Sequence, residues 1–268
     1  MRNEILYLGR WQPLATEFYI AKYLSEYIPV RKAKFHDKNL DLNAKYILTA
    51  LPTLAHSEFW ESIKSIKIAH IFDLVRHTPR EELYFDRLKH FDIVISPENV
   101  EYPFPHEYLQ QGYDPEDYFP IKRTKIYDVG FIGHIYCSRR SQIKKLVKIV
   151  IRKNVYRERF SAFVNECKIM LAMPSWIDIS GYWSDRVYLY LACGGFVLHH
   201  YVEGIEEEFE DGKHLAYYYS MQDLVEKINF YLKKDFLRDK IAEKGYERVK
   251  NFTWRERVKS LWQIISRL

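Results

Sequence analysis

The segment formed by residues 183–198 constrains the fold more than any other part of the chain. It reads Trp-Ser-Asp-Arg-Val-Tyr-Leu-Tyr-Leu-Ala-Cys-Gly-Gly-Phe-Val-Leu. Gly194 and Gly195 can end a helix and turn the chain at once, because glycine has no Cβ to oppose the conformation that such a turn needs. The segment therefore predicts a helix over residues 183–192, followed directly by a buried strand over residues 196–198.

Strand patterns and helix patterns alternate along the whole chain, which is typical of parallel sheets with right-handed crossovers. In the first half we expect strands at 4–8, 46–49, 66–72 and 92–96, and helices at 16–27 and 78–90. The second of these helices is expected to start at a Thr78 N-cap followed by Pro79. The segment 97–126 holds five prolines and few periodic apolar positions, so it predicts a connection between domains. We therefore expect an α/β chain with an N-terminal domain over residues 1–124 and a C-terminal domain over residues 125–268.

The second half repeats the alternation. We expect strands at 126–132, 169–173 and 196–198, and helices at 139–150, 158–167, 183–192, 220–233 and 253–268. Ser220 is the expected cap of one helix, and Thr253 with Glu256 forms the capping-box pattern of the last. The interval between residues 150 and 158 is too short for a further strand–helix unit. Residues 204–212 are rich in glutamate and predict an acidic helix closed by Asp-Gly.

The chain from about Asp114 onward resembles the C-terminal domain of GT-B glycosyltransferases, specifically their CgeB-like, group 1 branch. The resemblance is carried by the order and spacing of six segments, at residues 114–120, 127–134, 168–175, 183–198, 237–245 and 252–258. It implies two Rossmann-like domains facing a cleft, with the last helix packing back on the N-terminal domain. It also implies a glycosyltransferase of the hexosyltransferase type, with a nucleotide-sugar as donor substrate and no separate cofactor.

Gly133 and His134 follow an expected strand, and Ser138, Arg139 and Arg140 lie around the start of the next helix. Glycine lets a ligand approach the backbone closely, and the planar arginine donors suit phosphate. By resemblance, this loop faces the diphosphate or the transferred sugar of the donor. The alternative is a plain strand–helix turn with a solvated basic face.

A second group of donor-binding candidates surrounds the start of the helix expected over residues 183–192. A helix N-terminus and an arginine can both stabilise the negative charge of a leaving nucleoside diphosphate. The candidates are Ser180, Gly181, Tyr182, Trp183 and Arg186. The alternative is that Asp185 caps the helix while Arg186 pairs with a surface acid.

The turn Pro174-Ser175 follows another expected strand, and in the resembling enzymes this turn lies near the nucleotide base. The alternative is a turn chosen for its geometry alone. Many retaining GT-B enzymes also carry two glutamates eight positions apart, the second of which binds the ribose hydroxyls. Here Gly181 and Leu189 occupy those positions. Glu203 is our candidate for the missing ribose contact, and a non-catalytic nucleotide- or glycan-binding module is the alternative function.

Asp73 and His77 are the catalytic candidates. Both follow the strand expected over residues 66–72, at the end of a parallel sheet where α/β proteins bind their ligands. An inverting transferase needs a base that takes the proton of the acceptor hydroxyl, and either side chain has that chemistry. The alternative is that Asp73 only shapes the turn at the end of the strand.

Composition narrows the remaining choices. No two aspartates stand two positions apart, so the Asp-x-Asp metal motif is missing, and no metal site is expected. The adjacent His199 and His200 lack zinc-ligand spacing and are expected to point to opposite faces of a strand, one packed and one exposed. Three cysteines are an odd number without close pairing, which favours a reducing compartment.

The net charge of +5 suits an anionic partner without choosing one. The acceptor is therefore left open among glycan, protein, lipid and nucleic acid, and a nucleic-acid-modifying glycosyltransferase stays a second alternative. No apolar stretch is long enough for a transmembrane segment, and the polar N-terminus is not typical of a signal peptide. We expect a cytoplasmic protein, either soluble or peripheral to a membrane.

Overall fold

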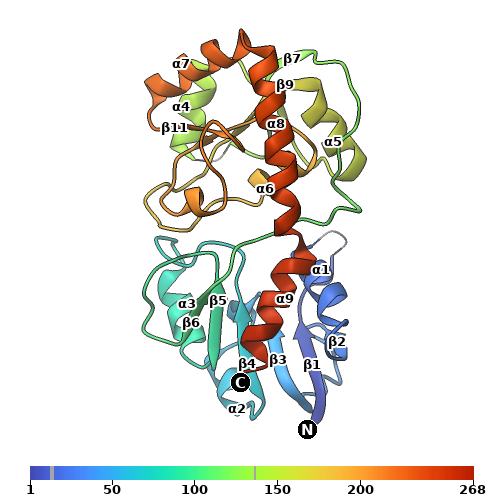
Figure 1. Cartoon of the computed structure of the whole chain (residues 1–268). Coiled ribbons are helices and arrows are strands. Elements are labelled where there is room, and N and C mark those ends of the chain that lie inside the picture. The colour runs from blue at the N-terminus through green and yellow to red at the C-terminus, as the bar shows by residue number, and fades with distance from the viewer. Residues whose placement is uncertain (13–14, 136) are drawn as a thin grey trace. The chain divides into compact units, whose positions relative to one another are not determined.

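The computed structural model describes residues 1–12, 15–135 and 137–268. The chain forms two compact units (Figure 1). The first unit joins Met1–Gln111 to Trp254–Leu268, and the second comprises Gly112–Thr253. The first unit thus contains both ends of the chain, and its N-terminal part ends thirteen residues before the boundary expected at 124.

The first unit is built on a six-stranded sheet in the order β2-β1-β3-β4-β5-β6. Each neighbouring pair is parallel, with Leu6 of β1 opposite both Arg31 of β2 and Ile47 of β3. Its strands are β1 (Arg2–Leu8), β2 (Val30–Ala33), β3 (Ala44–Thr49), β4 (Ile66–His70), β5 (Ile93–Ser96) and β6 (His106–Tyr108).

Apolar layers cover both faces of this sheet, because a parallel sheet buries both of its sides. The helices of the unit are α1 (Thr16–Leu24), α2 (Ser57–Ser62), α3 (Glu81–Leu88) and α9 (Trp254–Ile265), with a 3-10 turn at Pro52–Leu54. Figure 1 shows α9, in red, beside the blue helix α1. Val258 and Leu261 of α9 share one core with Ile5 and Ile20, which confirms that the last helix packs back on the N-terminal domain.

The second unit is built on a five-stranded parallel sheet in the order β11-β10-β9-β7-β8. Its strands are β7 (Tyr127–Ile132), β8 (Val150–Arg152), β9 (Cys167–Ala172), β10 (Val197–His200) and β11 (Ala216–Tyr218). Its helices are α4 (Ser138–Leu146), α5 (Arg157–Glu166), α6 (Arg186–Ala192), α7 (Met221–Leu232) and α8 (Asp235–Val249), with 3-10 turns at Ile205–Glu207 and Lys250–Phe252.

The two glycines after α6 serve different purposes: one allows the chain to turn, and the other allows close packing. Gly194 has a φ of 75°, which is the left-handed conformation expected after a helix. A Cβ on Gly195 would come within 2.6 Å of the Val164 side chain, so only glycine fits against α5. The predicted sequence of helix, double glycine and buried strand is confirmed, and so is the α/β class with two parallel sheets.

Several helix boundaries predicted from the sequence were wrong. Helix α3 begins at Glu81 with Arg80 in the N-cap position, and the Thr78 hydroxyl lies in the turn before it, where it donates to the Val75 carbonyl and accepts from the N–H of Arg80. Helix α6 begins at Arg186 rather than at residue 183. The cap at Ser220 is confirmed, since its hydroxyl oxygen accepts a hydrogen bond from the backbone N–H of Asp223 at 3.1 Å.

Other corrections concern strands and burial. The chain after α4 forms the edge strand β8 where we expected the end of a helix, and the predicted acidic helix is only the 3-10 turn Ile205–Glu207. His199 and His200 are both buried, because β10 lies inside the sheet and both of its faces are covered. Burial lowers the pKa of His199 to about 3, so this imidazole is neutral at physiological pH.

Candidate functional site

The donor-binding candidates gather at one edge of the second unit's sheet. Strand β9 lies between β7 and β10 and is parallel to both, so the loops that follow these three strands leave the same edge. These loops carry Gly133 and His134 after β7, Pro174 and Ser175 after β9, and Glu203 after β10. In α/β proteins this carboxyl edge is where ligands bind.

Arg186 fastens the start of α6 to the end of β7. Its Nε–H donates to the carbonyl oxygen of Ile132 at 2.7 Å, and its Nη1 donates to the Ser184 hydroxyl at 2.6 Å. Gly133 has a φ of 143°, and a Cβ on it would lie 3.0 Å from Nη2 of Arg186. The structure thus brings two sequence-predicted residues, Gly133 and Arg186, into contact.

Arg140 is buried, although the sequence placed it with Arg139 on a basic helix start. Its Nε–H donates to the carbonyl oxygen of Met173 at 2.9 Å, and its Nη1 donates to the carbonyl oxygen of His134 at 3.0 Å. It therefore ties the loop after β7 to the loop after β9. The neighbouring Arg139 lies in α4, and its side chain is outside the described part of the structure.

Gly181 and Glu203 meet through their backbones. The N–H of Gly181 donates to the carbonyl oxygen of Glu203 at 2.9 Å, and both Gly181 and Gly204 adopt positive φ. A Cβ on Gly204 would contact the backbone of Gly181 at 3.5 Å. The Glu203 side chain is exposed, while those of Ser180 and Tyr182 are half-buried.

Trp183 lies in the core of the unit and is fully buried. Its indole N–H donates to the Tyr188 hydroxyl at 3.0 Å, and that hydroxyl donates to Oε2 of Glu208 at 2.7 Å. The Trp183 side chain therefore supports the segment before α6 from beneath. Pro174 is also buried, whereas Ser175 after it is half-buried.

The catalytic candidates lie in the first unit, in the loop that follows β4. The side chains of Asp73 and His77 are both exposed. The backbone N–H of His77 donates to Oε2 of Glu81 at 2.6 Å, and His77 has a φ of 58°, which is uncommon for a residue with a side chain. Burial raises the pKa of Tyr84, and the negative charge of Asp73 raises it further.

Glu98 is a buried residue that the sequence analysis missed. It follows β5, is fully buried, and accepts a hydrogen bond from the backbone N–H of Val75 at 2.5 Å. The Tyr102 hydroxyl donates to its other oxygen. Burial raises the pKa of Glu98 to about 7, against the opposing effect of its bonds to the backbone of Val75 and Arg76.

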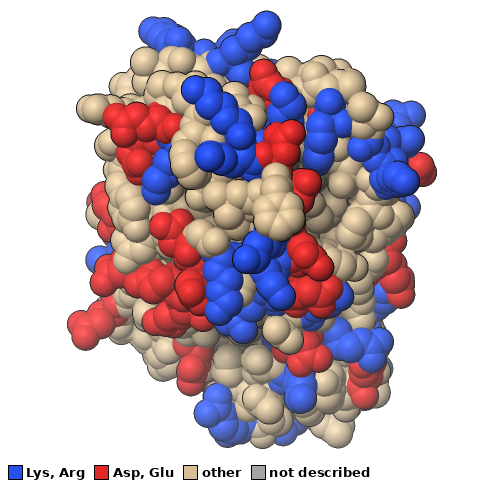
Figure 2. Space-filling view, turned by 45° about the horizontal axis from the view of Figure 1, so that its top comes forward, with Lys and Arg blue, Asp and Glu red and all other residues tan. Residues whose placement is uncertain are grey.

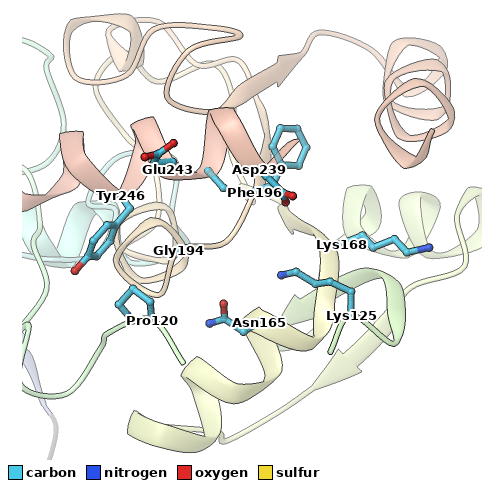
Figure 3. Close-up of a pocket in the computed structure, with 10 residues that line it drawn as sticks. Pro120, Lys125, Asn165, Lys168, Gly194, Phe196, Asp239, Glu243 and Tyr246 are labelled. Atoms are coloured by element: carbon cyan, nitrogen blue, oxygen red, sulfur yellow. The ribbon is translucent and has the colours of Figure 1, made fainter. Parts of the chain in front are cut away.

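A cavity of about 460 Å³ lies at the opposite, amino edge of the second unit's sheet (Figure 3). Its lining includes Lys125 before β7, Gly194 and Phe196 before β10, and Asp239 on α8. Figure 3 shows the side chain of Lys168 pointing away from Lys125. The lining contains none of the residues predicted for the donor site.

Three further features follow from the described residues. No helix among them has the length and apolar character needed to cross a bilayer. No group of three His, Cys, Asp or Glu side chains in the described ranges is arranged to hold a metal ion. All three cysteines are free thiols.

The comparisons with known proteins agree with this architecture. The model of a family described as glycosyl transferase-like matches residues 120–263, which is more than half of the chain. The chain belongs to this family and is a glycosyltransferase. A comparison with curated protein sequences found no match. The CgeB-like branch within the family stays a prediction.

Solved structures define the fold further. Sucrose-phosphate synthase from Thermosynechococcus elongatus has a TM-score of 0.74 at 12% identity, with 99% of each chain covered. Anabaena HepE, in complex with UDP and glucose, has a TM-score of 0.71 at 13% identity, with 100% of each chain covered. The BGT of T4 phage, in complex with UDP-glucose, has a TM-score of 0.68 at 14% identity and covers 100% of this chain and 99% of its own. These similarities give the chain a GT-B fold.

Proposed function

We propose that the protein transfers a sugar from a nucleotide-sugar donor, and that the donor diphosphate binds at the carboxyl edge of the second unit's sheet. The observation that carries this proposal is the convergence of Gly133, Gly181 and Arg186 at that edge. The similar structures of HepE and T4 phage BGT hold UDP or UDP-glucose, which supports a uridine nucleotide as the first donor to test.

The two glycines would serve by lacking a side chain rather than by donating hydrogen bonds. The N–H of Gly133 already donates to the carbonyl oxygen of Arg152 at 2.9 Å, and the N–H of Gly181 donates to Glu203. Positive charge at the diphosphate would come from Arg186, whose Nη2 lies beside Gly133. A guanidinium group at this place stabilises the leaving nucleoside diphosphate as its negative charge develops.

The catalytic base is proposed to be Asp73, with His77 as the second candidate in the same loop. In an inverting transfer, the acceptor oxygen forms a bond to the anomeric carbon while the bond from that carbon to the phosphate oxygen breaks. The nucleoside diphosphate leaves with the bonding electrons, and the acceptor proton passes to the base. The exposed position of Asp73 after β4 leaves its carboxylate accessible to an acceptor.

Two further parts of the proposal concern the donor. Glu203 would contact the ribose in place of the second glutamate, whose position is occupied by Leu189, and its exposed side chain is compatible with that role. Transfer is proposed to proceed without a divalent metal ion, because the chain has no Asp-x-Asp motif.

The identity of the acceptor stays open. On the face shown in Figure 2, groups of Lys and Arg alternate with groups of Asp and Glu, and this pattern does not single out a nucleic acid.

A second candidate function is a binding module that holds a nucleotide sugar without turnover. The loss of both glutamates favours it, since the second of them contacts the ribose in many enzymes that resemble this chain. A thermal-shift screen of nucleoside diphosphates and their sugars identifies the ligand, because a ligand that binds only the native state raises the melting temperature. UDP release from UDP-glucose then separates the two functions.

In this assay a transferase is expected to show turnover by the wild type and a loss of at least tenfold in Asp73→Asn. A similar loss in His77→Gln instead of Asp73→Asn would move the base to His77. Binding of UDP-glucose without release of UDP would favour the binding module. No stabilisation by any nucleotide or nucleotide sugar would contradict both functions.

A further inference from the structure

The loop that carries Asp73 is held on both sides by buried polar side chains. On one side, the amide of Gln111 donates to the carbonyl oxygen of Phe72 at 2.8 Å. On the other side, Oε1 of Glu98 accepts from the N–H of Val75. Asp73 itself is exposed between these two anchors.

Glu98 acts on the backbone of the loop rather than on a side-chain charge. Its carboxyl group accepts from the N–H of Val75 and interacts with the backbone N–H of Arg76. An acceptor that serves two adjacent backbone N–H groups fixes the dihedral angles between them. The Val75 N–H is buried, so removal of the acceptor would leave it unsatisfied and favour a rearranged loop.

The loop that carries Glu98 is itself braced. The Tyr102 hydroxyl donates to Glu98, and the Tyr102 ring lies 4.7 Å from the ring of His106. Nε2 of His106 is 2.9 Å from the hydroxyl oxygen of Ser96, which also accepts from the N–H of Glu98 at 3.4 Å. The loop of Glu98 is therefore braced by Ser96, the last residue of β5, and by His106, the first residue of β6.

Arg76, in the loop after β4, contacts the loop after β5 in turn. Its Nη2 donates to the carbonyl oxygen of Glu101 at 2.5 Å, and its guanidinium carbon lies 5.3 Å from the centre of the Tyr102 ring. The loops after β4 and β5 are thus joined by a carboxyl group in one direction and by a guanidinium group in the other. His77, one residue after Arg76, is held separately by Glu81.

We infer that Glu98 is a positioning residue, which fixes the loop of Asp73 and His77 in the conformation that presents the base to the acceptor. This inference rests on the proposed function, because it concerns the acceptor side of that reaction. The role requires a hydrogen-bond acceptor at position 98. Glutamine supplies one, and alanine does not.

The test compares Glu98→Ala, Glu98→Gln and Tyr102→Phe with the control Glu101→Gln, whose side chain is exposed in the same loop. UDP-glucose in water is the probe for turnover, and calorimetry with UDP measures nucleotide binding.

We expect kcat to fall at least tenfold in Glu98→Ala and about threefold in Tyr102→Phe. Glu98→Gln is expected to stay within threefold of the wild type, and Glu101→Gln is expected to be unchanged. The UDP dissociation constant should change less than twofold throughout, because the proposed nucleotide site lies in the other unit.

Hydrogen exchange gives a readout that does not depend on activity. Peptides covering residues 72–78 should exchange at least tenfold faster in Glu98→Ala and at the wild-type rate in Glu98→Gln. Unchanged kcat or unchanged exchange in a folded Glu98→Ala would overturn the inference. The proposed function would still stand in that case, provided that the wild type shows turnover. Equal losses in Glu98→Gln and Glu98→Ala would also overturn it. If Glu98→Ala does not fold, wild-type kcat in Tyr102→Phe overturns the inference. A wild type that neither binds UDP nor releases it from UDP-glucose contradicts the proposed function instead.

Discussion

The Nε–H of Arg186 donates to the carbonyl oxygen of Ile132, 2.7 Å away, at the point where β7 ends and Gly133 begins. The Tyr190 hydroxyl donates to the same carbonyl and accepts from the N–H of Ile132 at 2.8 Å. Two side chains of α6 therefore fix the end of the strand. These bonds link the loop at Gly133 to α6 in the proposed donor site.

Arg186→Ala should weaken UDP binding by about 1.5–3 kcal/mol, the usual worth of a hydrogen bond to a charged group. Arg186→Lys is the matched control for charge, because lysine keeps the positive charge but cannot bridge Ile132 and Ser184 as a guanidinium does. We expect an intermediate affinity for it in calorimetry. An affinity in Arg186→Ala equal to that of the wild type would remove Arg186 from the donor site.

Gly133→Ala should both destabilise the protein and weaken UDP binding. A Cβ at this position would meet the Phe131 ring at 2.9 Å and the Arg186 guanidinium at 3.0 Å, and a φ of 143° adds strain of about 1–3 kcal/mol. Gly212→Ala is the control, because Gly212 also has a positive φ but a Cβ added there would have no atom within 4 Å. Chemical denaturation and calorimetry should show a smaller stability loss and normal UDP affinity for Gly212→Ala. Normal affinity in Gly133→Ala would contradict a close approach of the nucleotide there.

Glu98 should make stability depend on pH. Its pKa in the folded state, about 7, lies above the ordinary value of 4.5, so its contribution is complete below pH 4.5 and is lost as pH rises to about 7. Arg76 lowers this pKa and Glu81 raises it, while burial holds the pKa of the nearby His106 at about 4 and keeps its imidazole neutral in this window.

The contribution of Glu98 to the free energy of unfolding should fall by on the order of 1–3 kcal/mol between pH 4.5 and 7.5. The measurement is the melting temperature of the wild type and of Glu98→Gln across this range. The difference between the two should shift in favour of Glu98→Gln as pH rises. A difference that does not change with pH would show that Glu98 titrates as an ordinary exposed glutamate.

Turnover should survive chelation of divalent ions. The diphosphate charge is proposed to be met by basic side chains such as Arg186 and by helix dipoles, and the sequence has no Asp-x-Asp motif to hold a metal ion. UDP release from UDP-glucose is measured with and without EDTA, and then after magnesium is added back. Complete loss of turnover that magnesium restores would contradict this prediction.

The sequence predicts the alternating strands and helices of this fold better than the buried polar side chains that hold its loops. Strand–helix alternation and the double glycine at Gly194 and Gly195 indicate parallel sheets, because periodicity and glycine geometry act locally. Glu98 lies in the run Ser-Pro-Glu-Asn, which by composition is typical of an exposed turn. It is buried only because the loop after β4, more than twenty residues earlier, folds over it. No local pattern carries that information.

The candidate site shows the same division. The sequence places Gly133 and Arg186 at the ends of separate elements, and their contact follows from the topology of the sheet. Trp183 is predicted as the first residue of a helix that faces a ligand, but its indole packs into the core and α6 begins three residues later. The prediction that one of His199 and His200 is exposed was wrong for a related reason. Alternating side chains give one exposed face only where a sheet is open to solvent on one side.

The central claim is that a nucleotide binds at the carboxyl edge of the second unit's sheet. Hydrogen exchange of the whole protein with and without saturating UDP tests it most directly. The account predicts slower exchange in peptides that cover residues 133–135, 173–176 and 180–187, with no change around the cavity lined by Lys125 and Asp239. Protection confined to that cavity, or to the first unit, would contradict it.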